Sequence, residues 1–267
     1  MKNICVLYVE YDNNKYPYSW DILQIYLNKL DPFYNIEVVK IDNKCEECYY
    51  PDDWICAANE IFSKFKTIKI KGNNHEWEFS GWQKARNYII RYEYSYDSVL
   101  LINDSFITND YFLNKKLFDK TCIDKCIEDN VVVGKVDNLY NRKENNCKLF
   151  TIEYNNDYKD IHSWMRTNIF YMPKSIVNEI SFVSIKKEDT SNYISDNINN
   201  PFMNKISIDL QRNIGNWIEN KWHSKFKVTK ETYEFFKMKC LSILNEKLLT
   251  YNISQKYNII NVNDIIA

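Results

Sequence analysis

Short apolar runs alternate with amphipathic stretches along the first half of the chain. The runs carry few polar positions, as strands buried in a sheet do, and they occupy residues 3–9, 36–42, 67–70 and 98–102. The stretches between them repeat apolar positions at helical spacing, at residues 20–30, 54–65 and 82–89. Ser19 and Ser80 stand where an N-cap is expected, and Pro32 stands where a helix must stop. Because strand and helix alternate, the pattern predicts βαβ units and an α/β fold with a central, mostly parallel sheet flanked by helices.

The second half of the chain contains a longer polar interruption. Residues 109–127 predict a helix, and residues 131–136 predict a strand in which Gly134 permits a close backbone approach. Residues 137–160 are polar and rich in Asn, so they predict either a hairpin or an excursion over the site. A further strand is predicted at residues 167–172.

The end of the chain predicts a long amphipathic helix at residues 230–253. Packing on the domain, self-association and binding at a membrane surface are all open to such a helix. Its mixed charge argues against a membrane role, and packing is the usual one.

Length and charge narrow the class of protein. A chain of 267 residues is long enough for one α/β domain with an extended core. With 35 basic and 36 acidic residues, it has no excess of positive charge for a nucleic-acid backbone. The first residues do not resemble a secretion signal, and no window approaches the roughly 20 apolar residues of a membrane helix. We therefore expect a cytoplasmic protein with no transmembrane segment and no nucleic-acid partner.

The eight cysteines are expected to be reduced in such a protein. Cys45 and Cys48 have the spacing of half a zinc site or of a redox motif, but the chain offers no second pair of this spacing to complete four ligands. Cys122 and Cys126 lie one helical turn apart and are expected to be ordinary helix residues.

Polar residues follow the buried strands where a binding crevice is expected. In open α/β sheets, ligands bind outside the carboxyl ends of the strands. Asn103, Asp104 and Ser105 directly follow the strand at 98–102, and Tyr11 follows the first strand. Tyr11 could stack on a base or lie in a solvated turn.

The loop and helix before that strand add candidates for anion binding. Asn73 and Asn74 could donate to a diphosphate or ribose, or shape a turn. Ser80, at the expected helix start, could offer its backbone N–H to an anion. Arg86 could pair with a phosphate or with Asp104, or lie on the surface.

The same stretch carries a resemblance to a known family. The Asn-rich loop, the ARN tripeptide at 85–87, the apolar strand and its acidic end are similar to the donor-binding half of GT-A glycosyltransferases. The sequence EFSGW followed by INDS resembles the bacterial polysaccharide-synthesis branch related to rhamnan synthesis proteins. The resemblance covers residues 70–110, is looser to about residue 220 and ends there.

The resemblance implies a metal-assisted donor site. In such enzymes an Asp-any-Asp motif holds a divalent metal, Mn²⁺ or Mg²⁺, on the sugar-nucleotide diphosphate. Here Asn103-Asp104-Ser105 offers one carboxylate, so Asp104 would hold the metal together with phosphate oxygens. His223 stands where some of these enzymes have a late metal-ligating histidine.

The resemblance also implies an acceptor side. Residues 1–110 would form the nucleotide-sugar-binding half, 111–228 the acceptor-binding half and 229–267 a C-terminal helical extension. Trp164 would pack on an acceptor sugar and Arg166 would pair with an anionic group, while His162 could be a base or a structural residue.

A carboxylate is needed to take the proton of the acceptor hydroxyl if the transfer inverts the sugar. The candidates are, in order, Asp209, Asp189 and Glu188, and a solvated loop is the alternative for each.

We therefore expect a glycosyltransferase that moves a sugar from a nucleotide-diphosphate sugar to a glycan acceptor in polysaccharide or glycoconjugate synthesis. The alternative is a catalytically silent GT-A-like protein that binds a glycan or a partner. A nucleotidyltransferase is a third rival, but the chain lacks a Gly-rich phosphate loop.

Overall fold

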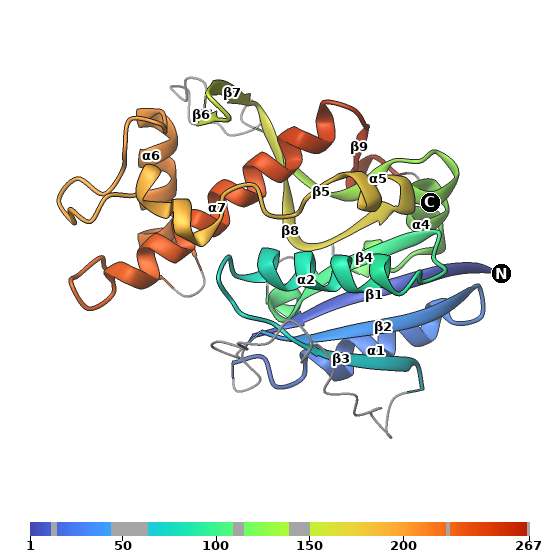
Figure 1. Cartoon of the computed structure of the whole chain (residues 1–267). Helices are drawn as coiled ribbons and strands as arrows, with labels where there is room; N and C mark the ends of the chain where they lie inside the picture. The colour runs from blue at the N-terminus through green and yellow to red at the C-terminus, as the bar shows by residue number, and fades with distance from the viewer. Residues whose placement is uncertain (12–14, 44–63, 109–114, 139–149, 223–224, 266–267) are drawn as a thin grey trace.

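The computed structural model describes residues 1–11, 15–43, 64–108, 115–138, 150–222 and 225–265 (Figure 1). These residues form an α/β fold in which helices flank a seven-stranded, mostly parallel sheet. The predicted fold class is therefore confirmed. Cys45, Cys48 and His223 lie outside the described residues, as does all but the end of the helix predicted at 54–65.

The order of the strands across the sheet differs from their order in the sequence. From edge to edge they are β3 (Lys66–Lys71), β2 (Tyr34–Asp42), β1 (Lys2–Glu10), β4 (Ser98–Asn103), β8 (Ser163–Pro173), β5 (Val132–Asn138) and β9 (Ile259–Asn261). The first four run parallel to one another, whereas β8 runs antiparallel to both of its neighbours. Two further strands, β6 (Phe150–Tyr154) and β7 (Asp157–Ile161), form the hairpin predicted within residues 137–160.

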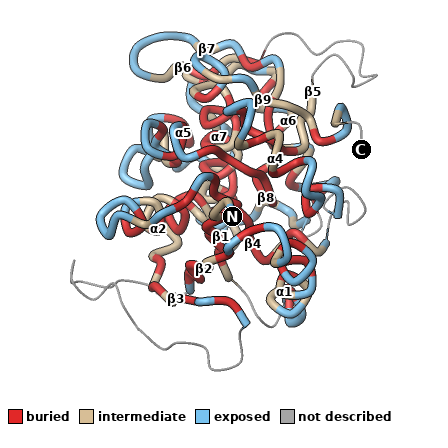
Figure 2. Tube along the Cα trace, turned by 90° about the vertical axis from the view of Figure 1, so that its right-hand side faces the viewer, coloured by how far each residue is buried: buried red, intermediate tan, exposed pale blue. Residues whose placement is uncertain are grey.

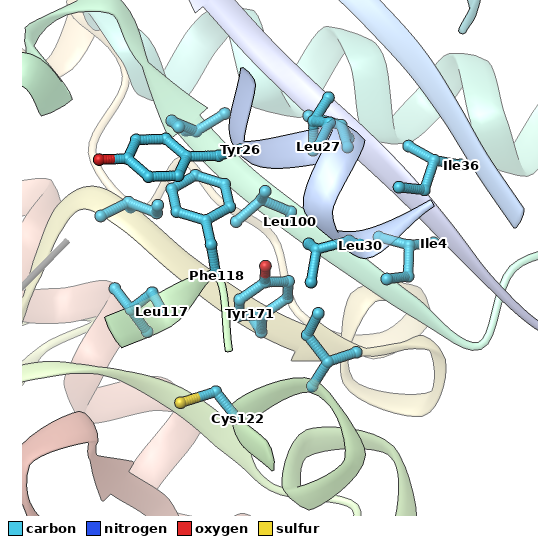
Figure 3. Packing of buried hydrophobic residues seen from close by; sticks show 14 of the residues in the cluster. Ile4, Tyr26, Leu27, Leu30, Ile36, Leu100, Leu117, Phe118, Cys122 and Tyr171 are labelled. Atoms are coloured by element: carbon cyan, nitrogen blue, oxygen red, sulfur yellow. The ribbon is translucent and has the colours of Figure 1, made fainter. Parts of the chain in front are cut away.

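Alternation along the central strands sends side chains to two helical layers. Tyr8 and Leu100 lie in a core with α1 (Ser19–Leu30) and α4 (Lys120–Glu128), part of which is shown in Figure 3. Leu7 and Leu101 face the opposite way, into a core with α2 (Glu78–Arg91), α5 (Lys174–Glu179) and the end of α7 (Tyr233–Ser254). Figure 2 shows the buried strands between α1 and α2. The middle segments of β1 and β4 are apolar without interruption because both faces of the sheet are covered there.

A third core joins the later elements. It combines the β6–β7 hairpin, α6 (Ile208–Asn216), the π-helical turn η4 (Trp217–Lys221) and the first half of α7. Shorter helical turns are η1 (Asp104–Ile107), η3 (Lys187–Asn192) and η5 (Val262–Asp264). In the C-terminal part of the chain, α7 packs in two cores and β9 joins the central sheet.

Both predicted N-caps are wrong. The hydroxyl of Ser19 lies 2.8 Å from the hydroxyl of Tyr8 and makes no cap hydrogen bond. Ser80 lies inside α2, which begins two residues earlier, after Trp77 with a positive φ of 56°. At Gly134 a side chain, and not another backbone, comes close, because a Cβ there would lie 2.7 Å from the sulfur of Met165.

Within the described ranges, no helix combines the length and the apolar composition that a membrane span requires.

Candidate functional site

Two adjoining cavities open at the carboxyl ends of the parallel strands. In Figure 1, β1 starts at the N-terminus and runs toward the left side of the view, the side on which α6 and the first half of α7 lie. The smaller one, here called the strand-end cavity, has a volume of about 100 Å³, and the larger main cavity has about 400 Å³. The two share the lining residues Glu78, Asn103, Ser105, Trp222 and Lys239.

The residues predicted at the ends of β1 and β4 lie in this region. Asn103, Asp104, Ser105 and Tyr11 all line the strand-end cavity. The Asp104 side chain is 4 % exposed, and its Oδ2 accepts a 2.7 Å hydrogen bond from the backbone N–H of Tyr11. The hydroxyl of Ser105 donates to Oδ1 of Asn103 at 2.7 Å. Asp104 therefore fastens the end of β1 to the end of β4 at the cavity wall.

Of the two asparagines predicted in the Asn-rich loop, one lines a cavity. Asn73 shapes a turn, since its Oδ1 accepts from the N–H of His75, and Asn74 lines the strand-end cavity instead. Asn43, which the sequence analysis missed, also lines it and donates to Asn74 and to the carbonyl of Trp77. The signal for Asn43 was its position directly after β2.

Two residues predicted to bind an anion form hydrogen bonds with backbone groups of the protein. Arg86 donates to the carbonyls of Val177 at 2.5 Å and Asn178 at 2.7 Å, so it ties α2 to the end of α5 and not to a phosphate or to Asp104. The hydroxyl of Ser80 donates to the carbonyl of Trp77 and accepts from the N–H of Glu76. Ser80 therefore closes the turn that leads into α2.

A lysine in a cage of indole rings lies where the cavities meet. Lys239 of α7 is 9 % exposed, and its Nζ lies 4.4 Å from the ring centre of Trp77, 5.0 Å from that of Trp222 and 5.6 Å from that of Trp217. Burial lowers the pKa of Lys239. Trp77 also stacks on Tyr11, with ring centres 5.8 Å apart.

The main cavity receives two of the three residues predicted for the acceptor. Arg166 lines it and is held by Asp137 through a bidentate pair of 2.9 Å and 3.2 Å hydrogen bonds. Trp164 lines it too, but the Nζ of Lys247 lies 3.6 Å from its ring centre, so that ring already carries a cation. His162 is exposed and lies outside both linings.

The three carboxylates predicted as bases lie elsewhere. Glu188 and Asp189 are exposed in η3, and Asp209 is near Arg212 on α6, with 3.9 Å between the charged atoms. None of these three described residues lines either cavity. No pattern in the sequence indicated which side of these segments faces the cavity. Among the described residues, the carboxylates in the linings are instead those of Glu78, Asp104, Asp137 and Glu246.

Glu78 and Glu246 meet at one hydroxyl. Thr167 donates to Oε2 of Glu246 at 3.0 Å and lies 3.4 Å from Oε1 of Glu78. Burial raises the pKa of Glu78. Glu246 and Lys239 belong to α7, and the sequence signal for them was the presence of charged residues within an otherwise apolar helix.

The described donors do not make up a metal site. Asp104 supplies one carboxylate, and one of its oxygens already accepts from Tyr11. Within the described residues there is no group of three or more His, Cys, Asp or Glu side chains that could hold an ion. A divalent cation here would depend on oxygens from its substrate.

Comparison with models of protein families and with the sequences of curated proteins gave no match.

Proposed function

We propose that this protein transfers a sugar from a nucleotide-diphosphate sugar to a glycan acceptor. The observation that carries the proposal is the pair of adjoining cavities at the carboxyl ends of β1 and β4, joined at Glu78 and Lys239. Ligands of open α/β sheets bind at such strand ends. Two substrates that react at one carbon must be held side by side in the right orientation, and two adjoining cavities allow this.

The lining suggests which substrate lies where. Tyr11 and Trp77 give the strand-end cavity aromatic surfaces for the nucleoside end of the donor. The main cavity is larger and lined by polar groups such as Asn168 and Asn213, which suit the hydroxyl groups of the donor sugar and the acceptor. The resemblance of residues 70–110 to GT-A glycosyltransferases supports the same assignment.

Glu78 is the base in this proposal. Its side chain lines both cavities, and burial raises its pKa, which makes the ionised carboxylate a stronger base. The acceptor oxygen attacks the anomeric carbon while the bond from that carbon to the diphosphate breaks. Glu78 takes the proton of the acceptor hydroxyl, and the nucleoside diphosphate leaves.

The test is a substrate panel for the full chain. UDP-, GDP- and dTDP-sugars are incubated with mono- and oligosaccharide acceptors, and both the released nucleoside diphosphate and the mass of the product are measured. Glu78→Gln should lower the rate by about a hundredfold or more, as loss of a general base does. Glu188→Gln is the matched control and should leave the rate unchanged, because Glu188 is exposed and outside the cavities. Full activity of Glu78→Gln would refute its role.

One observation favours a second candidate, a catalytically silent protein that binds a glycan or a partner. Asp104 is a single carboxylate that is largely buried and holds the backbone of Tyr11. In that case sugar nucleotides or glycans bind, but no nucleoside diphosphate is released from any pair in the panel.

A further inference from the structure

Lys239 is a buried cation at the junction of both cavities. Its side chain reaches the linings from α7, together with Asn103 and Ser105 from the end of β4. Within the described part of the chain, its Nζ contacts indole rings and has neither a hydrogen-bond acceptor nor a carboxylate at ion-pair distance. A buried ammonium in this condition is costly unless an anion reaches it.

The nearby carboxylates are engaged by other donors. Glu246 accepts from the N–H and the hydroxyl of Thr167, and Asp104 accepts from the N–H of Tyr11. Asp137 is held by Arg166. Glu78 lies close enough to influence Lys239 electrostatically but beyond ion-pair distance. The ammonium is thus left facing the space that the two cavities share.

The cage also prepares the ammonium for an anion. Three indole rings around one Nζ restrict the long lysine stem by cation–π contacts. Lys239 is only 9 % exposed, and charges attract each other more strongly where little water screens them. An anion at the junction would meet the ammonium with the polar side chains of Asn103 and Ser105 beside it.

We infer that Lys239 binds the diphosphate of the donor and supplies the positive charge that a protein-held metal ion would otherwise provide. The identity of the anion rests on the proposed function, whereas the anion site itself rests on the geometry of Lys239. The described donors around Asp104 do not make up a metal site, and a lysine is a well-suited point charge for phosphate oxygens. The same charge would stabilise the nucleoside diphosphate as it leaves.

The test is calorimetry on the full chain with inorganic pyrophosphate, UDP, GDP and dTDP, in EDTA and again with Mg²⁺. Pyrophosphate and at least one of the nucleotides should bind equally well in both buffers. Lys239→Met should weaken this binding by about tenfold or more, as loss of a hydrogen bond to a charged group does, while Lys239→Arg should retain most of it. Binding of the corresponding nucleoside should change little in either variant.

Lys237→Met is the matched control. Lys237 lies two residues before Lys239 on the same helix and lines neither cavity. It forms ion pairs with Asp196 and Glu234. This variant should bind like the unmodified protein. Circular dichroism establishes that each variant is folded.

Three results would overturn the inference: no binding of any of the four anions, binding that EDTA abolishes, or unchanged binding by folded Lys239→Met. The first two are measured on the unmodified protein, so they do not depend on the folding of a variant. Anion binding as expected without sugar transfer would refute the proposed function alone. Sugar transfer with unchanged binding by Lys239→Met would refute this inference alone.

Discussion

The position of a residue after a predicted strand indicated some of the cavity residues but not others. Asn103, Asp104, Ser105 and Tyr11 were predicted from their positions after apolar runs, and all four line the strand-end cavity. This worked because the carboxyl end of a parallel strand determines where the next residues lie. Arg86, on the other hand, depends on which carbonyls of a distant helix lie opposite it, and no local pattern contains that information.

The titration of Glu78 gives a pH prediction for stability. Burial raises its pKa above the ordinary 4.5, so the folded protein holds this proton over a pH range in which the unfolded chain has lost it. The contribution is full below pH 4.5 and is lost as the pH rises through the folded pKa, with a limiting slope of about 1.4 kcal/mol per pH unit. Glu78→Gln lacks this titration.

The measurement is urea unfolding of both proteins at several pH values upward from the ordinary carboxylate pKa of 4.5. As the pH rises, the free energy of unfolding of the unmodified protein should fall relative to that of Glu78→Gln. A difference that stays constant over this range would show that the carboxylate titrates as it does in the unfolded chain.

Among the elements, α7 was predicted in its extent but not in its role. Its length and position in the chain were correctly expected for residues 230–253, yet its role in the site was missed. A periodic pattern indicates that a face is buried but not what covers it. The direction of β8 and the short β9 were missed for related reasons, because an apolar run has no direction and three residues give no pattern.

Asn245 provides a test of how α7 is fixed. It is fully buried, and its side chain accepts from the N–H groups of Ser184 and Ile185 and donates to the carbonyl of Ile185. Asn245→Ala leaves these three backbone groups without partners, which should lower the free energy of unfolding by about 3 kcal/mol. Urea unfolding measures it.

Asn252→Ala is the control on the same helix. Asn252 makes one hydrogen bond, to the hydroxyl of Ser184, and is only partly buried. It should cost about 1 kcal/mol or less, the net value of one hydrogen bond. Equal losses in the two variants would mean that Asn245 does not anchor the segment that leads into η3.

On the scale of the whole molecule, the two cavities lie where separate cores meet. The second core contains α2 and the central strands, and the third core contains α6 and the first half of α7. Glu78 of α2 and Lys239 of α7 both line the two cavities. A nucleotide that occupies the site would therefore connect the central sheet with the later half of the chain.

This connection predicts a pattern of hydrogen exchange. At a concentration of about 100 times its dissociation constant, a nucleotide that binds only the folded protein stabilises it by about 2.7 kcal/mol. Local opening that separates the cores should then become rarer, so amide exchange should slow both at the start of α2 and in the first half of α7. Amide exchange by local opening should slow less in α1, which packs on the other face of the sheet. Mass spectrometry of deuterium uptake, with and without the diphosphate that binds most tightly, measures these three segments together. Protection confined to α1, or to only one of the two cavity-lining helices, would mean that the ligand binds within one core and that the junction at Lys239 is not its site.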